Sequence, residues 1–299
     1  MSKKDLTIVI VTKNRPEMLF RILNSLVSQK NKDFEVIIVD NDNLKSGFVI
    51  YKYFLESLNI SYYSVIKQGV PFVRNKALEV VKTDYLAFID DDCVVQRSWV
   101  NNAYKIINKF PQFTYFVGCS KLLNFSSKIA LAQYAFQEYW HKKKLKGVFV
   151  SGSSVDTKNI IFKMSDLRKN KALFDTKIRL GWYDSCDTDL GFYMDSKKLS
   201  GLYVEKLIIW HEETQNLLSF FKKSYYRGAL SKLIANKWKI ENQFVDLSHQ
   251  SFISYIKSVK NWPKEYKEYK SYFKSINLIS FLLIKIYEKI SLIGYVQQN

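Results

Sequence analysis

The chain has 299 residues, of which 47% are apolar, and it carries 46 Lys and Arg against 28 Asp and Glu for a net charge of +18. With only 10 Gly and 4 Pro, this composition excludes disordered, collagen-like and low-complexity chains. The length suits one large domain or two smaller ones with a buried core. The three cysteines lie far apart in the sequence, so we expect no disulfide framework and a reducing compartment.

The lengths of the apolar runs and the net charge indicate the cellular location of the protein and the kind of partner it binds. The first apolar run, residues 6–11, is too short for a secretory signal, and no run reaches the ~20 apolar residues of a membrane span. We therefore expect a cytoplasmic protein. The positive excess indicates an anionic partner, which is a nucleotide phosphate, an acidic lipid surface or a nucleic acid.

The first 90 residues alternate between strand and helix patterns. Continuous or alternating apolar runs predict strands, apolar residues at helical spacing predict helices, and Pro16 and Pro71 are plausible helix starts. The predicted strands are 6–11, 35–39, 60–65 and 85–89, and the predicted helices are 18–27, 48–58 and 71–81. This alternation predicts an α/β fold with a mainly parallel central sheet.

The remaining chain is less regular. A basic run at residues 141–147 is typical of an exposed loop, and residues 202–210 resemble a strand that ends at His211. From residue 216 onward the pattern is helical. Residues 218–299 hold 14 Lys and Arg against five Asp and Glu, which is half of the net charge of the chain.

Polar side chains follow the predicted parallel strands where each strand ends. Thr12 and Asn14 follow the first strand, Asp40 and Asp42 end the second, and an aspartate triplet follows the fourth. Sheets of this kind bind ligands at the carboxyl ends of their strands. The sequence therefore predicts a ligand site at this edge.

The aspartate triplet is the strongest candidate for metal binding. On a continuing strand Asp90 and Asp92 would share a face, where two carboxylates repel each other unless a cation lies between them. Mg²⁺ and Mn²⁺ prefer such oxygen ligands. The alternative is a solvated acidic turn. The sequence contains neither a glycine-rich dinucleotide fingerprint nor a P-loop, which disfavours both of those folds.

Six motifs in register then resemble one family. They are TKNR at 12–15, VDND at 39–42, Gly69 with RNKA at 74–77, FIDDDCVVQRSWV at 88–100, Gly181 followed by DTDLG at 187–191, and IWH at 209–211. In this order and spacing the chain resembles the family 2 glycosyltransferases of the GT-A type from residue 5 to about residue 235. The resemblance implies a GT-A fold with a C-terminal helical extension.

The resemblance also implies roles for individual residues. Asp40 would accept a hydrogen bond from the base or ribose, Arg74 would contact phosphate or sugar, and His211 would lie near the diphosphate. For His211 the alternative is a core histidine at a strand end. The implied nucleotide-sugar-binding residues are Thr12, Asn14, Arg15, Asp40, Asp42, Arg74, Asp90 and Asp91. The implied ligands of Mn²⁺ or Mg²⁺ are Asp92 and His211.

Asp187 is the expected general base. An acceptor hydroxyl is a poor nucleophile, so a carboxylate must take its proton as it attacks the anomeric carbon, and this displacement inverts the configuration. The family often has Glu-Asp where this chain has Cys186-Asp187, and we interpret Cys186 as a buried packing residue. Asp184 and Asp189 are rival bases. The expected acceptor-binding residues are Trp182, Tyr183 and Asp184, although the two aromatic residues are equally typical of a core.

These features predict a metal-dependent, inverting glycosyltransferase with a UDP-sugar donor and a glycan or lipid-linked glycan acceptor. The expected setting is synthesis of a bacterial surface polysaccharide. Residues 1–217 would form the transferase domain, with a nucleotide-binding half at 1–120 and an acceptor-binding half at 121–217. A sugar-nucleotide nucleotidyltransferase and a non-catalytic glycan- or lipid-binding protein are the alternatives.

Residues 218–299 are expected to form a basic helical region. Aromatic and lysine residues interleave there, which is typical of a helix lying on an anionic lipid surface. The protein would then be peripheral at the inner face of the plasma membrane. A helical cap with a solvated lysine face is the alternative, and no nucleic-acid-binding module is recognisable.

Overall fold

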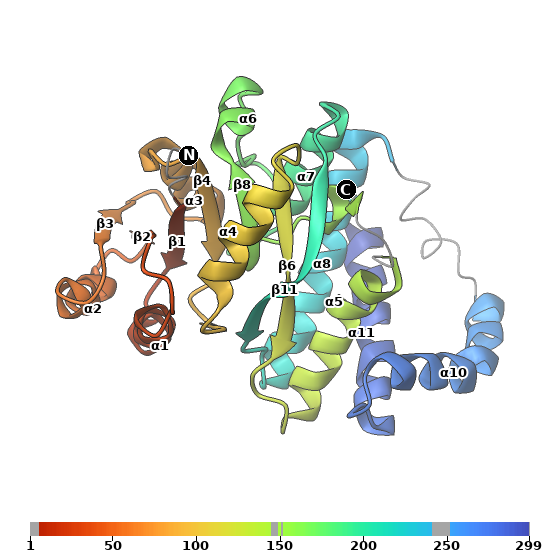
Figure 1. Cartoon of the computed structure of the whole chain (residues 1–299). Coiled ribbons are helices and arrows are strands. Elements are labelled where there is room, and N and C mark those ends of the chain that lie inside the picture. Colours follow the sequence, from red (N-terminus) through yellow and green to blue (C-terminus); the bar gives the residue numbers. More distant parts are fainter. Residues whose placement is uncertain (1–5, 145–148, 151, 241–251, 299) are drawn as a thin grey trace. The chain divides into compact units, whose positions relative to one another are not determined.

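A computed structural model describes residues 6–144, 149–150, 152–240 and 252–298 (Figure 1). The chain divides into two compact units. The sheet unit comprises Met1–Leu123, Gly147–Lys177 and Cys186–His211. The helical unit comprises Asn124–Lys146, Ile178–Ser185 and Glu212–Asn299. This grouping is discontinuous in sequence, whereas the predicted division at residue 217 is a single cut.

The first seven elements of the sheet unit confirm the predicted alternation. Pro16 and Pro71 stand in the first turns of their helices, where a missing backbone N–H costs no hydrogen bond. The second helix starts two residues earlier and ends four residues earlier than predicted. The elements are β1 (Leu6–Thr12), α1 (Pro16–Val27), β2 (Glu35–Asp40), α2 (Ser46–Phe54), β3 (Ile60–Ser64), α3 (Val70–Val80) and β4 (Tyr85–Ile89).

The sheet is parallel in its first half and mixed in its second. The remaining elements of the unit are β5 (Cys93–Val95), α4 (Trp99–Lys109), β6 (Tyr115–Leu122), β7 (Phe149–Val150), the 3₁₀ turn η1 (Gly152–Ser154), β8 (Asn159–Lys163), α6 (Met164–Lys169), α7 (Cys186–Ser196) and β11 (Gly201–His211). The strand order is β3-β2-β1-β4-β8-β6-β11-β5. Strand β8 runs antiparallel between β4 and β6, and β5 is antiparallel to β11. The α/β class is as predicted.

One face of the sheet packs on helices α1 and α4. Ile8 and Ile10 of β1 share a buried cluster with Leu19 and Leu23 of α1 and with Trp99 of α4. Neighbouring residues on a strand point to opposite faces, so a continuous apolar run such as β1 needs cover on both faces. This packing supports the strand ends from one face of the sheet.

Asn159 is buried and connects several elements of the sheet unit by hydrogen bonds. Its Nδ2 atom donates to the carbonyl oxygens of Leu207 at 2.8 Å and Cys119 at 3.1 Å, and its Oδ1 atom accepts from Trp99 Nε1 at 3.1 Å. The side chain is only 2% exposed. Asn159 therefore links β8 with β6, β11 and α4.

Asn159→Ala is expected to lower the free energy of unfolding by about 2–4 kcal/mol, because buried groups on several partners lose their hydrogen bonds. Urea denaturation followed by fluorescence measures the change. Asn108→Ala, at an exposed position of α4, is the matched control and should stay within about 0.5 kcal/mol of the wild type. Equal stability of the two variants would contradict the role given to Asn159.

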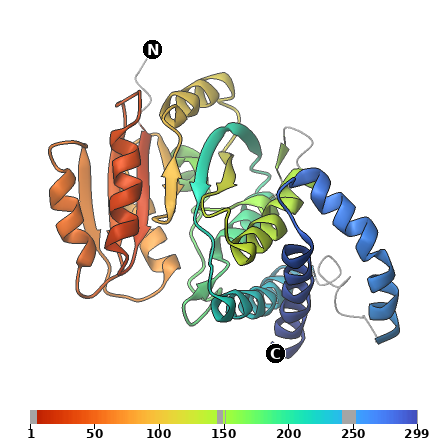
Figure 2. The ribbon, with the colours of Figure 1, turned by 90° about the horizontal axis from the view of Figure 1, so that it is seen from below.

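The helical unit confirms the prediction of a helical C-terminal region. Its elements are α5 (Lys128–Lys144), a hairpin of β9 (Arg179–Leu180) and β10 (Tyr183–Asp184), α8 (Leu217–Trp238), α10 (Phe252–Tyr272) and α11 (Leu278–Gln297). Helix α11 lies against α8 (Figure 2). A Cβ atom at Gly228 would collide with the carbonyl oxygen of Ser291, so this approach requires glycine.

An aromatic core fills the helical unit. The rings of Tyr139 in α5 and Tyr269 in α10 stack with centroids 4.3 Å apart, and Phe220, Phe281 and Tyr287 belong to the same buried cluster. Helix α5 continues to Lys144, so residues 141–144 are helical where a loop was predicted, and residues 145–147 lie outside the described residues. Among the described helices, none has the length and apolar character needed to cross a membrane.

Candidate active site

The ends of β1 and β4 meet at the aspartate triplet. Thr12 Oγ1 donates to Asp91 Oδ2 at 2.7 Å, and Arg15 Nη1 donates to Asp91 Oδ1 at 3.1 Å. Asn14 takes a left-handed conformation with φ 51°, which turns the chain sharply before Arg15. Asp91 is only 4% exposed, so the structure uses it to join the two strand ends. Its predicted contact with the donor stays a prediction.

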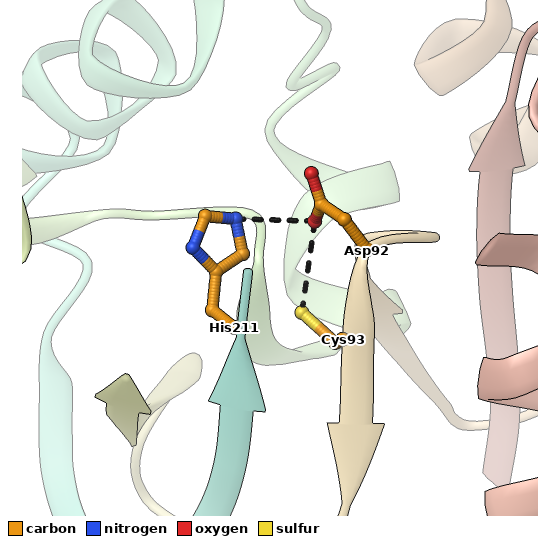
Figure 3. Close-up of side chains that lie close together, drawn as sticks. All are labelled: Asp92, Cys93 and His211. Atoms are coloured by element: carbon orange, nitrogen blue, oxygen red, sulfur yellow. Dashed lines mark hydrogen bonds and ion pairs between the residues drawn. The ribbon is translucent and has the colours of Figure 1, made fainter. Parts of the chain in front are cut away.

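The two predicted metal ligands lie together. His211 ends β11, and the strand register places it opposite Cys93 at the start of β5. His211 Nε2 lies 3.1 Å from Asp92 Oδ1 (Figure 3). Arg15 Nη1 lies 3.4 Å from Asp92 Oδ2. Asp92 and His211 thus offer an oxygen and a nitrogen to one point at the end of the sheet.

Cys93 is a third potential ligand that the sequence did not reveal. One ligand atom from each of Asp92, Cys93 and His211 lies within 4.8 Å of the others. Burial, and then the nearby Asp92, raise the pKa of the Cys93 thiol well above its ordinary value, whereas the metal-binding form is the thiolate. Mn²⁺ and Mg²⁺ also prefer oxygen to sulfur. The donor set that fits these ions is therefore Asp92 with His211.

Asp90 comes close to Asp92 for a reason that differs from the predicted one. Strand β4 ends at Ile89, and residues 90–92 form a turn, so the alternation of strand side chains does not apply to them. Burial, followed by repulsion from Asp92, raises the pKa of Asp90 to about 7, while Arg74 and His211 act in the opposite direction. Concentrated negative charge at this point favours a bound cation.

Asp156 and Lys158 belong to the same neighbourhood and were missed by the sequence analysis. Asp156 contributes to raising the pKa of Asp90, and Lys158 Nζ lies 2.7 Å from Asp156 Oδ2. Both precede β8, which runs antiparallel to β4 with Asn159 opposite Ile89. The start of β8 therefore lies beside the end of β4. The missing signal was the direction of β8.

Arg74 connects helix α3 to the start of α7. Its Nη1 atom donates to Cys186 Sγ at 3.1 Å, and its guanidinium lies over the Phe174 ring at 5.6 Å. The next residue, Asn75, exchanges two 2.9 Å hydrogen bonds with the backbone of Phe174. Cys186 is fully buried, as predicted for a packing residue. Arg74 is only 8% exposed and adds positive charge near Asp90.

Asp187 stands in the first turn of α7. Its Oδ1 atom accepts from the backbone N–H of Thr188 at 2.7 Å, and the residue is half-buried. Helix α7 approaches the η1 turn so closely that a Cβ atom at Gly191 would collide with the carbonyl oxygen of Gly152. The rival Asp189 is only 2% exposed, whereas Asp184 and Asp187 are half-buried.

Asp40 and Asp42 shape the loop after β2. Asp40 is fully buried and accepts hydrogen bonds from Asp42 N, Gly47 N and Tyr62 Oη at 2.8, 3.2 and 2.7 Å. Asp42 accepts from the backbone N–H of Ser46, which lowers the pKa of Asp42. The structure thus places both side chains in internal bonds, and their predicted nucleotide contacts stay predictions.

Asn41, between these two residues, organises the next loop and was not anticipated. Its side chain donates to the carbonyl oxygens of Val65 and Lys67 at 2.8 and 3.0 Å and accepts from Gly69 N at 2.8 Å. Gly69 has φ 132°, a conformation that favours glycine. Asn41 therefore fixes the turn that opens helix α3, which carries Arg74.

The predicted acceptor residues lie on the hairpin of the helical unit. Gly181 at its turn has φ 61°, and Trp182 beside it is 60% exposed, so Trp182 is not a core residue. Tyr183 stacks on Tyr226 of α8 with ring centroids 4.2 Å apart. Asp184 ends the hairpin and is half-buried. Trp182 presents an apolar ring suited to stacking.

Solved structures share the fold of the chain. S. aureus TarS 1-349 in complex with UDP-GlcNAc matches with a TM-score of 0.54 and 12% identity, over 97% of this chain and 89% of that one. The mannosyltransferase PcManGT from Pyrobaculum calidifontis in complex with GDP-Man and Mn²⁺ matches with a TM-score of 0.62 and 12% identity, over 98% and 87%. The fold is therefore the GT-A fold, as predicted.

Curated relatives match parts of the sequence. A poly(ribitol-phosphate) beta-glucosyltransferase from Bacillus spizizenii is 28% identical over 203 residues, which are 65% of this chain and 30% of that protein. A chondroitin synthase from Pasteurella multocida is 33% identical over 100 residues, 32% of this chain and 10% of that protein. The matches thus span less than a third of either relative.

The family model described as "Glycosyl transferase family 2" matches residues 7–167. This range covers more than half of the chain and runs from β1 through β8, including the aspartate triplet and Asp156. The chain belongs to glycosyl transferase family 2.

Proposed function

We propose that the protein is a metal-dependent, inverting glycosyltransferase that moves a sugar from a UDP-sugar to a hydroxyl group of a glycan or lipid-linked glycan. The observation that carries this proposal is the approach of His211 Nε2 to within 3.1 Å of Asp92 Oδ1 in a family 2 chain. Ligands bind at the carboxyl ends of strands in sheets of this type.

Asp92 and His211 would hold Mn²⁺ or Mg²⁺. A carboxylate combined with an imidazole suits Mn²⁺ better than Mg²⁺, which favours oxygen ligands throughout. When bound, the ion supplies positive charge that offsets the charge developing on the leaving diphosphate. The Mn²⁺ in the structure of PcManGT supports this assignment.

The donor would lie over the turn after β1. Thr12, Asn14 and Arg15 form this turn, and the Arg15 side chain is 51% exposed beside Asp92. A half-exposed guanidinium can meet a phosphate in a planar, bidentate contact. UDP-GlcNAc in the TarS structure supports a uridine nucleotide as part of the donor. The PcManGT structure contains GDP-Man instead, so the experiment below compares uridine with guanosine nucleotides.

The transfer step needs a base and a stabilised leaving group. Asp187 would take the proton of the acceptor hydroxyl as its oxygen attacks the anomeric carbon. The bond from that carbon to the donor diphosphate breaks, and the diphosphate leaves with the electron pair. Attack from the face opposite the diphosphate inverts the configuration. Arg74 would add positive charge on the donor side.

The acceptor is proposed to be a carbohydrate chain. Trp182 is exposed at the hairpin turn, where its ring would stack on a sugar, with Tyr183 and Asp184 beside it. Two of the relatives are named as a chondroitin synthase and a poly(ribitol-phosphate) beta-glucosyltransferase. They support a role in bacterial surface polysaccharide synthesis.

A thermal-shift screen of UDP, GDP and UDP-sugars with and without Mn²⁺ tests the function. We expect UDP with Mn²⁺ to raise Tm by roughly 5 °C at about 100 times its Kd, because a ligand of the native state stabilises it by mass action. UDP alone should give a smaller shift. Pyrophosphate release from a nucleoside triphosphate would instead identify a nucleotidyltransferase. Glycan binding without transfer from any donor would identify a non-catalytic binding protein.

A further inference from the structure

Helix α10 presents a row of lysines on one face. Four exposed lysines recur every three or four residues, which places them on the same side of an α-helix. They are Lys260, Lys264, Lys267 and Lys270. Glu265 and Glu268 lie outside this row, around the helix toward its packed side. We call these four residues the lysine row.

The opposite face of α10 is packed. Its Tyr266 ring lies 5.3 Å from Phe281 of α11, and its Trp262 ring lies 6.3 Å from the same residue. Lys285 of α11 forms ion pairs with Glu265 of α10 and, at 2.8 Å, with Glu288. These contacts fix α10 within the helical unit, so the lysine row points away from its core.

Helix α11 also carries exposed apolar side chains on one face, with the half-buried Lys289 among them. Its buried face, including Phe281, Ile284 and Tyr287, packs within the helical unit. Six apolar side chains on the other side are 39% to 61% exposed. They are Leu278, Ile279, Leu282, Ile286, Ile293 and Val296. We call these six residues the apolar stripe, and exposed apolar side chains gathered on one face of a helix indicate an interaction surface.

We propose that the helical unit docks on the surface of an anionic phospholipid bilayer through the lysine row and the apolar stripe. The lysines would meet lipid phosphates, while the stripe enters the boundary between headgroups and acyl chains. The inner leaflet of a plasma membrane is an anionic surface of this kind. This inference goes beyond the proposed sugar transfer and does not depend on it.

Charge complementarity favours a bilayer over a second copy of the chain. Residues 218–299 carry 14 Lys and Arg against five Asp and Glu. A symmetric contact between two copies places the same patch against itself, so the two lysine rows would repel each other. An anionic bilayer attracts the row instead. A stripe on a helix that is buried on its other side also suits a helix lying in the interface rather than spanning it.

Vesicle sedimentation of the full chain tests the proposal. We expect the wild type to bind mixed vesicles of phosphatidylglycerol and phosphatidylcholine and not to bind vesicles of pure phosphatidylcholine. Salt should release the protein from the mixed vesicles. Each lysine near such a surface is worth about a fivefold change in partition. Substituting the whole lysine row by glutamine should therefore reduce partition by about 100-fold or more.

The matched control removes the same charge from the sheet unit. It substitutes four exposed lysines by glutamine, namely Lys30, Lys82, Lys105 and Lys169. This control should keep most of the binding if the row is specific. A second variant, Ile286→Gln with Ile293→Gln, should weaken binding about tenfold without removing its salt dependence, since each buried methylene adds to the affinity.

Three results would overturn the proposal. They are no binding of wild type to anionic vesicles, equal loss in the lysine-row variant and its control, and a dimer in solution that the apolar-stripe variant converts to monomer. The last result would make a second copy the occupant. Transfer to a soluble acceptor should continue in the lysine-row variant, so failure of the docking surface is distinguishable from failure of the transferase.

Discussion

Asp92→Ala is expected to abolish Mn²⁺-dependent donor binding and to lower sugar transfer by about 10²–10³-fold, the cost typical of losing one electrostatic contact to a developing charge. Asp92 Oδ1 lies 3.1 Å from His211 Nε2, so the variant removes one of the two proposed metal ligands that lie together at this point. Calorimetric titration of UDP with and without Mn²⁺ measures the binding, and radiolabelled transfer measures the rate.

The folded state should tolerate this substitution. Asp92 repels Asp90, and Arg15, which lies 3.1 Å from Asp91, should keep that contact when Asp92 is removed. Asp92→Asn keeps the shape of the side chain while removing its charge, and it should lose Mn²⁺ dependence as well. Glu56→Ala removes an exposed carboxylate elsewhere in the sheet unit and is the matched control. If UDP affinity in Asp92→Ala equals that of the wild type, with and without Mn²⁺, the metal role given to Asp92 is wrong.

Local patterns carried most of what could be predicted about the fold. The apolar runs of β1, β2 and β4 are continuous because those strands are buried on both faces, and Pro16 marks the start of α1. Such signals lie within a few residues of one another. The accumulation of polar residues at strand ends also predicted a candidate site at this edge, since parallel strands end at the same edge of a sheet.

The parts of the site that escaped prediction depend on contacts between distant segments. Asp156 approaches Asp90 because β8 pairs antiparallel with β4, some 70 residues earlier in the chain, and no local pattern records that direction. Cys93 faces His211 through the register of β5 and β11. The internal hydrogen bonds of Asp40 were equally hidden, because composition does not say whether a carboxylate is buried.

The second large effect concerns the base. Asp187→Asn should leave UDP binding unchanged and lower transfer by about 10²–10⁴-fold, the range supplied by general base catalysis. Asparagine keeps an oxygen that can accept the N–H of Thr188, now 2.7 Å from Asp187 Oδ1, so the first turn of α7 should persist. An amide cannot take the proton of the acceptor hydroxyl. Initial rates under donor saturation measure the loss in kcat.

Variants of the two rival carboxylates, Asp184 and Asp189, test which residue is the general base. Asp184→Asn changes a half-buried residue of the hairpin and should retain transfer within a fewfold of the wild type. Asp189 is 2% exposed, so Asp189→Asn should act on stability, with a lower Tm and a kcat near normal in the folded fraction. A large loss in Asp184→Asn combined with normal transfer in Asp187→Asn would move the base to the hairpin. Donor binding is measured in each variant. Loss of the general base, which leaves UDP binding unchanged, can therefore be distinguished from loss of the donor-binding site.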